Sequence, residues 1–146
     1  MLSNSCRYGI RAVIYLASHY PLKTNIGIKQ ISNDLDLPAP FLAKILQQLA
    51  KSGLISSTKG PNGGFLWNKK PESITMFDII KTIDGEGIFK NCIIRDGYCS
   101  EVRKSKKSCP VHDGYSRIRA ELVKLYKSKT VAELVKTAGD TGKVFI

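Results

Sequence analysis

The fold is decided by residues 39–65, which read APFLAKILQQLAKSGLISSTKGPNGGF. The first half has helical spacing and predicts a helix that begins at Pro40 or Phe41 and ends at Ser52, where Gly53 supplies a left-handed stop. The second half predicts a β-hairpin, with strands at 54–58 and 65–67 joined by a turn dense in Gly, Pro and Asn. The apolar stripe of the predicted helix is Leu42, Ile45, Leu46 and Leu49, and its opposite face carries Ala43, Lys44, Gln47, Gln48 and Lys51.

Just before this stretch, residues 28–35 predict a short helix with Ile28, Ile31 and Leu35 on one face, followed by a tight break at 36–38. Two helices joined by a short turn and followed by a hairpin with a basic tip make a winged helix-turn-helix. In such a unit the second helix enters the major groove of DNA. Each element alone is equally compatible with an ordinary amphipathic helix or an ordinary turn, but their order and spacing favour the winged helix.

DNA contacts are expected on the outer face of the second helix and at the hairpin tip. Small residues at the start of the helix would let its backbone approach the bases, and Lys and Gln side chains would reach base edges or phosphates. At the tip, Lys59 supplies charge and the glycines permit close approach. The candidate DNA-binding residues are Lys29, Ala39, Pro40, Ala43, Lys44, Gln47, Gln48, Lys59, Gly60, Pro61, Asn62 and Gly63.

The rest of the chain predicts further helices and one long irregular segment. Helices are expected at 8–19 with Asn4 or Ser5 as cap, at 76–83 with Thr75 as cap, at about 111–127 and at 131–137. Periodicity is lost over 84–108, and loops of that length are usually functional or disordered. We expect a mainly α fold with a small β-hairpin wing, in one compact domain. Its parts are a DNA-binding region at 1–83, a cysteine-bearing loop at 84–110, helices at 111–137 and a tail at 138–146.

Composition supports a polyanionic partner and a cytoplasmic location. The net charge is +11, from 23 basic and 12 acidic residues, and it favours nucleic acid over a membrane surface. Both halves of the chain are basic, so charge does not locate the site. No apolar run approaches the roughly eighteen residues of a membrane span, and the N-terminus lacks a signal-peptide pattern. Neither a catalytic triad, nor a carboxylate pair, nor a phosphate loop is visible, so we do not expect an enzyme.

Three of the four cysteines lie close together, in the pattern C-x6-C-x9-C-x2-H formed by Cys92, Cys99, Cys109 and His112. Three thiolates and an imidazole suit an iron–sulfur cluster or zinc, because soft sulfur donors bind both. Basic residues of the loop would lower the thiol pKa values. The alternative is that the cysteines are inert and bind no cofactor. Cys6 is expected to be a small packing residue.

The chain resembles the Rrf2 family of winged-helix transcription regulators over roughly residues 1–137. The matching stretches are CRYGIRA at 6–12, IKQIS at 28–32, FL with ILQQL and GLI between 41 and 55, KGPNGGF at 59–65, ITMFDII at 74–80 and DG at 84–85. The resemblance implies a homodimer whose long helix at about 110–127 packs against its mate. It also implies a partly palindromic duplex operator and, in several members, an iron–sulfur cluster.

Cluster-bearing relatives have three cysteines in the corresponding loop, at the tighter spacing C-x5-C-x5-C. Here the second gap is longer, with the excess at 103–108. One subgroup uses an acidic ligand near the start of the first helix, but the corresponding position here is Arg7, which cannot ligate. His112 is therefore the preferred fourth ligand, and the Cys3His set favours [2Fe–2S] over [4Fe–4S].

The leading hypothesis is a repressor whose DNA affinity responds to redox state, nitric oxide or iron through a cluster. The cysteine loop would adjoin the dimer helix and lie near the DNA-binding unit. A second hypothesis is a cluster-free regulator of the same family that uses thiol chemistry or a protein partner. A third, from another class, is a zinc-stabilised protein-interaction module.

Overall fold

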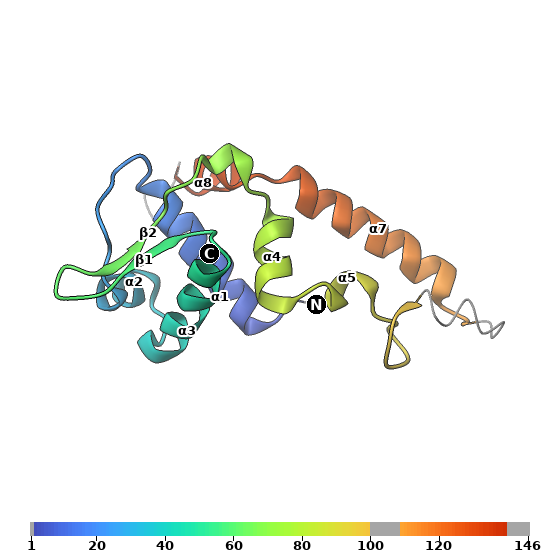
Figure 1. The fold of residues 1–146 in the computed structure, drawn as a ribbon. Helices are drawn as coiled ribbons and strands as arrows, with labels where there is room; N and C mark the ends of the chain where they lie inside the picture. Colours follow the sequence, from blue (N-terminus) through green and yellow to red (C-terminus); the bar gives the residue numbers. More distant parts are fainter. Residues whose placement is uncertain (1, 100–108, 140–146) are drawn as a thin grey trace.

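A computed structural model describes residues 2–99 and 109–139 and confirms a mainly helical fold with a two-stranded hairpin (Figure 1). The remaining predicted segments, 100–108 in the cysteine loop and 140–146 in the tail, lie outside the described residues. The elements are α1 (Asn4–Ser18), α2 (Ile28–Leu35), α3 (Ala39–Lys51), β1 (Ser56–Thr58), β2 (Gly64–Leu66), η1 (Pro71–Ser73), α4 (Met76–Asp84), α5 (Gly87–Lys90), α7 (His112–Ser128) and α8 (Val131–Gly139).

Helix α1 lies at the centre of the core and packs against α2, α3, α4 and α8. Most of its residues from Cys6 to Ala17 are buried. The helix begins at Asn4 rather than at Tyr8, and its N-cap is Ser3 rather than Asn4 or Ser5. The Ser3 hydroxyl oxygen accepts a hydrogen bond from the backbone N–H of Cys6 at 3.0 Å. The carboxylate of Asp84 also binds Ser3, and this tertiary contact explains why Ser3 is selected.

The helix-turn-helix formed by α2 and α3 matches the predicted bounds closely. Helix α2 ends at Leu35, and its C-cap residue Asp36 has the left-handed conformation, with φ 53°. Helix α3 buries the predicted stripe of Leu42, Ile45, Leu46 and Leu49 against α1 and α4. Gly53 has φ +74°, so the predicted left-handed stop is confirmed.

The hairpin is held by the segment that precedes α2 as well as by its own strands. Strands β1 and β2 pair antiparallel, with Ser57 opposite Phe65. Phe65 also exchanges two backbone hydrogen bonds of 2.9 Å with Ile26, just before α2. Gly64 makes this approach possible, because it has φ +149° and a Cβ there would lie 2.4 Å from the carbonyl oxygen of Ile26. The hairpin is therefore fixed to the start of α2.

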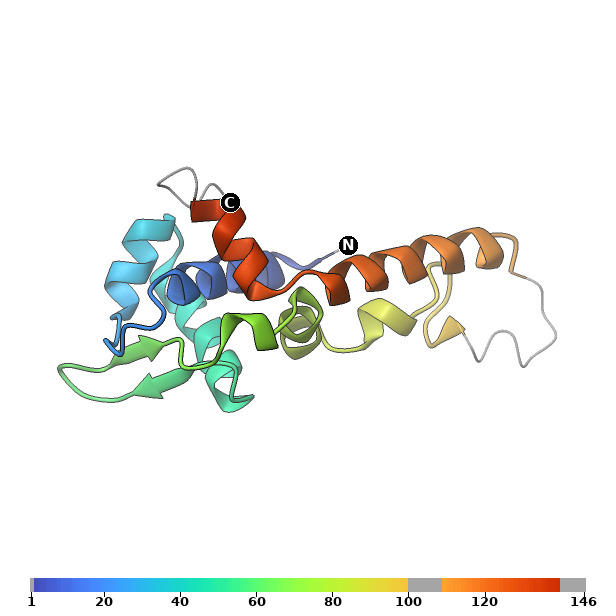
Figure 2. The ribbon, with the colours of Figure 1, turned by 90° about the horizontal axis from the view of Figure 1, so that it is seen from above.

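The C-terminal half consists of α4, α5, α7 and α8. Helix α4 begins with the predicted Thr75 cap, in a capping box with Asp78. Helix α5 is an element that the sequence did not predict. Helix α7 projects from the body, and α8 returns to pack against α1, with Val131 fully buried (Figures 1 and 2). Within the described ranges, no helix is long and apolar enough to span a membrane.

Helix α7 is unusual because none of its seventeen residues, all of them described, is buried. Its apolar side chains Ile118, Leu122 and Leu125 form one stripe that is 61%, 42% and 47% exposed. The end of α7 that begins at His112 lies at one end of the molecule, and the hairpin lies at the other (Figures 1 and 2).

Candidate DNA-binding surface and cysteine site

The outward face of α3 is a polar stripe opposite its buried face. Because successive helical residues are about 100° apart, Pro40, Lys44, Gln47 and Lys51 share one side of the helix. All four are exposed, whereas Ala39 and Ala43 are half-buried at the margin of the stripe. The stripe combines one ring, two cations and one amide, which are groups suited to base edges and phosphates. Lys51 is a member that the predicted contact set omits, although its position four residues after Gln47 is visible in the sequence.

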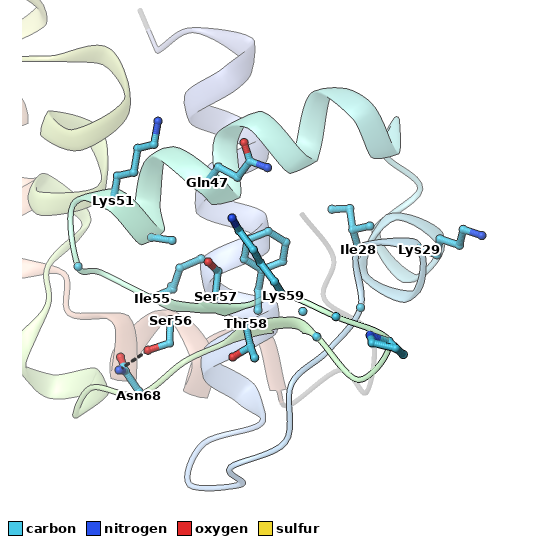
Figure 3. Close-up of a pocket in the computed structure, with 18 residues that line it drawn as sticks. Ile28, Lys29, Gln47, Lys51, Ile55, Ser56, Ser57, Thr58, Lys59 and Asn68 are labelled. Atoms are coloured by element: carbon cyan, nitrogen blue, oxygen red, sulfur yellow. Dashed lines mark hydrogen bonds between the residues drawn. The ribbon is translucent and has the colours of Figure 1, made fainter.

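An open groove of about 1150 Å³ separates α3 from the hairpin (Figure 3). Gln47 and Lys51 line it from α3, Lys29 lines it from the start of α2, and the Lys59 side chain points from the hairpin toward α3. The described residues that line the groove include these three lysines and no acidic side chain. The groove is therefore electropositive, as a surface that binds a phosphate backbone must be.

The glycines of the hairpin tip have two different roles. Gly60 has φ +107°, and a Cβ there would meet no described atom within 4 Å. Gly63 is required by the turn itself, because a Cβ there would lie 2.2 Å from the carbonyl oxygen of Thr58. The N–H of Gly63 also closes the turn by donating to the carbonyl oxygen of Gly60 at 2.9 Å. Lys59, Pro61 and Asn62 are exposed at the tip. The backbone at Gly60 can therefore approach a ligand closely, whereas Gly63 is needed to form the hairpin turn.

Gln48 lies on a different side of α3 from the groove. Its Nε2 donates to the carbonyl oxygens of Thr82 at 2.9 Å and Ile83 at 3.4 Å, in the last turn of α4. It lines a smaller hollow between α3 and α4, together with Asp78 and Lys81. Of the predicted contact residues on α3, Gln48 is the one whose polar group the fold already uses.

The four predicted ligands lie together where the cysteine segment, described at residues 91–99 and 109–111, meets α7. Cys92 and Cys99 are buried and Cys109 is half-buried, and all are free thiols. The Cys99 Sγ lies 3.4 Å from Nδ1 of His112, the first residue of α7. Hydrogen bonds from the backbone N–H groups of Ile94 and Arg95 are the largest influence on Cys92 and lower the pKa of its thiol. Hydrogen bonds with the Cys99 and Cys109 thiols lower it further.

This donor set fits an iron–sulfur cluster in its chemistry. Three sulfur atoms and one imidazole converge, and N–H groups already point at one sulfur, as they do around protein-bound clusters. In the described ranges, however, no three His, Cys, Asp or Glu side chains are arranged to hold a metal ion. The thiols are therefore gathered without a preformed coordination geometry.

The cysteine site adjoins α7, as expected, but it does not lie near the hairpin. It lies at the opposite end of the molecule (Figures 1 and 2). The predicted proximity to the DNA-binding unit does not extend to the hairpin, because α5 and the segment after it run alongside α7, away from the core. Arg119 of α7 holds that segment by donating to the carbonyl oxygen of Asn91 at 2.9 Å.

Together, the helix-turn-helix, the fixed hairpin and the electropositive groove define a winged-helix DNA-binding protein. The family model described as "Rrf2: Iron-dependent Transcriptional regulator" matches residues 2–137. The chain belongs to the Rrf2 family, whose members are DNA-binding transcription regulators rather than enzymes.

Relatives and solved structures agree with this assignment. An HTH-type transcriptional regulator of Aquifex aeolicus is 30% identical over 135 residues, which is 92% of this chain and 91% of the relative. The structure of CymR, the global cysteine regulator of B. subtilis, has a TM-score of 0.73 at 24% identity and covers 94% of this chain and 97% of its own. T. potens IscR has a TM-score of 0.72 at 21% identity, covering 97% and 90%. These two structures show the shared fold.

Proposed function

We propose that the protein is a cytoplasmic homodimeric repressor that binds a partly palindromic duplex operator and responds to an iron–sulfur cluster. The observation that carries this proposal is the convergence of Cys92, Cys99, Cys109 and His112 in a chain of an iron-dependent regulator family. A regulator that binds a chromosomal operator would act in the cytoplasm.

In the proposed complex, α3 enters the major groove with its outward stripe facing the bases. Lys44 and Gln47 would contact base edges or nearby phosphates, and Ala39, Pro40 and Ala43 would leave room for the backbone. The hairpin tip, from Lys59 to Gly63, would reach the minor groove or flanking phosphates, and Lys29 and Lys51 would hold the strand that crosses the groove. The absence of acidic side chains from the described lining supports this orientation.

The proposed dimer uses α7. An exposed apolar stripe of Ile118, Leu122 and Leu125 on a projecting helix is costly in water, and a second copy of the same stripe would cover it. Two-fold pairing of identical helices would place two copies of α3 for two operator half-sites.

The proposed cluster ligands are the four converging side chains, and the Cys3His set favours [2Fe–2S] over [4Fe–4S]. When bound, the cluster would supply one-electron redox chemistry and reactivity toward nitric oxide. The residues of this chain would keep the thiols ionised, through the N–H groups of Ile94 and Arg95, and would anchor one ligand at the start of α7.

A second candidate is a cluster-free thiol switch at the same cysteines. Its support is the lowered pKa of Cys92 beside two further thiols. A solved relative of similar fold, Staphylococcus aureus CymR, is known in an oxidized form, with a TM-score of 0.71 at 24% identity. A zinc-stabilised interaction module, by contrast, gains no support from membership in a family of transcription regulators.

Anaerobic purification tests the proposal. The repressor with a cluster should be coloured, contain iron and sulfide, and shift duplex DNA from immediately upstream of its own coding sequence. Colourless, iron-free protein whose operator affinity depends on thiol oxidation would favour the second candidate. Bound zinc in a protein that shifts no DNA would contradict both the cluster-bearing repressor and the thiol switch.

A further inference from the structure

The two sites of the proposed regulator are far apart in the fold, so a signal must pass between them through the protein. The cysteine segment lies at the α7 end, and the groove lies at the hairpin end (Figures 1 and 2). The shortest covalent connection runs from Cys92 back through α5 and Gly85 to the last turn of α4. What touches that last turn decides how a movement reaches the DNA-binding surface.

Helix α5, which leads directly into the cysteine segment, packs against α4. Phe89 of α5 stacks on Phe77 of α4 with ring centroids 4.5 Å apart, and it meets Tyr126 of α7 edge-on at 6.3 Å. Glu86 pairs with Lys81 of α4 at 2.6 Å and also with Lys90 of α5. A displacement of the cysteine segment would therefore be passed to α4 rather than absorbed at Gly85.

The last turn of α4 is in turn held against two helices of the DNA-binding unit. Ile83 packs against Gly9 of α1 so closely that a Cβ on Gly9 would lie 2.2 Å from its Cδ1 atom and 3.2 Å from Cγ2 of Ile45 on α3. The Asp84 carboxylate accepts a hydrogen bond from the N–H of Ser3 at 3.0 Å. These contacts make the end of α4 the junction of α1, α3 and α4.

Gln48 is the polar link from this junction to α3. Carbonyl groups in the last turn of a helix have no partner within the helix. The Nε2 of Gln48 donates to two of them, at Thr82 and Ile83. Its neighbour Gln47, one residue earlier, instead faces the groove.

We propose that Gln48 is a positioning residue that couples the state of the cysteine site to the orientation of α3, rather than a residue that contacts bases. The coupling rests on the proposed function, because it needs an operator affinity that changes with the cysteine site. The two neighbouring glutamines would then have different roles. Gln47 would contact DNA, and Gln48 would hold α3, the helix that carries Gln47, against α4.

The experiment measures operator affinity in two defined states of the cysteines, reduced and alkylated with iodoacetamide, on duplex DNA from upstream of the protein's own coding sequence. Coupling is the ratio of the two dissociation constants, and allosteric ratios are typically about 5–150-fold. Gln48→Met keeps the side-chain length but removes the donor, so its ratio should fall to within about twofold of 1. Gln48→Lys restores a donor to the carbonyl groups at the end of α4. Its added charge should change DNA affinity equally in both cysteine states and so cancel in the ratio. The wild-type ratio of dissociation constants should therefore return.

Gln47→Met is the matched control, and it should weaken binding in both states while keeping the ratio. Hydrogen exchange measured without DNA gives an independent readout. In the wild type, alkylation should alter the protection of amides in both α4 and α3. In Gln48→Met, it should alter the protection of α4 and leave that of α3 unchanged. The inference is overturned if Gln48→Met keeps the wild-type ratio, or if alkylation leaves α3 exchange unchanged in the wild type. Failure of the wild type to bind any upstream DNA would instead remove the proposed function, and the exchange experiment would still decide whether α3 senses the cysteines.

Discussion

Sγ of Cys99 and Nδ1 of His112 lie 3.4 Å apart, although thirteen positions separate the two residues in the chain. Because His112 is the first residue of α7, this contact joins the cysteine segment directly to the proposed dimer helix. A change of chemistry at Cys99 is therefore also a change at the start of α7.

The first prediction concerns these two side chains. Cys99→Ala and His112→Ala should each lower iron and sulfide content after anaerobic purification, because each removes one of four converging donors. Cys6→Ala is the matched control, since Cys6 is fully buried in α1 and should leave the chromophore intact. Full iron content in Cys99→Ala would exclude that thiol as a ligand.

A second prediction concerns Lys51, which the structure adds to the groove. Lys51→Ala should weaken operator binding and reduce the slope of log K against log salt by about 1, as expected when one phosphate contact is lost. Lys124→Ala, on the exposed surface of α7, should leave the slope unchanged. Equal slopes for Lys51→Ala and the wild type would place the DNA away from this groove.

A third prediction concerns the attachment of the hairpin. Gly64→Ala combines a positive φ with a Cβ 2.4 Å from the carbonyl oxygen of Ile26, and it should lower the free energy of unfolding by about 2–4 kcal/mol. Gly27→Ala, where a Cβ would meet no described atom within 4 Å, replaces only the N-cap glycine of α2 and should lower it by no more than about 1 kcal/mol. Urea denaturation compares the two variants. Similar losses in both would mean that the Ile26–Phe65 pairing contributes little.

A fourth prediction concerns the exposed stripe of α7. Leu122→Lys should convert a dimer into a monomer, because it places a charge where a second apolar stripe would pack. Ala120→Lys makes the same kind of change on another exposed side of α7 and should leave the dimer intact. Sedimentation velocity at several concentrations distinguishes the states. A wild-type protein that is monomeric throughout would rule out the proposed assembly.

A fifth prediction is a loss of stability at alkaline pH through Cys6. Burial is the main cause that raises the pKa of this thiol from 9.0 to about 12, with the negative charge of Asp84 adding to it. Above pH 9 the unfolded thiol ionises while the folded one stays protonated, so stability falls as pH rises toward 12. Denaturant midpoints at pH 8 and pH 10.5 should differ less in Cys6→Ala than in the wild type. An identical pH dependence in both proteins would contradict this assignment.

The sequence predicted those parts of the fold that are set by local pattern. Helices α2 and α3, the stop at Gly53 and the Thr75 cap were all predictable, because periodicity, glycine and capping residues act over a few positions. The start of α1 was misplaced, because Asn4, Ser5 and Ser3 are all plausible caps and only the distant Asp84 selects Ser3. Helix α5 was missed because four residues cannot display a period.

At the site, residue types were predictable but their directions were not. The cysteines and His112 were proposed from their spacing and from the family resemblance, and the structure brings them together. Gln47 and Gln48 are indistinguishable in sequence, and only the position of α4, fixed by long-range packing, gives them different partners. The distance between the cysteine site and the hairpin likewise depends on the course of α5 and α7.

The outward stripe of α3 has a consequence for the history of such regulators. Pro40, Lys44, Gln47 and Lys51 are exposed, and the core of α3 is formed by other residues. Substitutions at exposed positions usually change stability by no more than about 0.5 kcal/mol. A duplicated gene would therefore acquire a new operator by mutating this stripe while its folding and its cysteine site stay as they are. Diversification of target genes within one genome would then require changes in only a few codons.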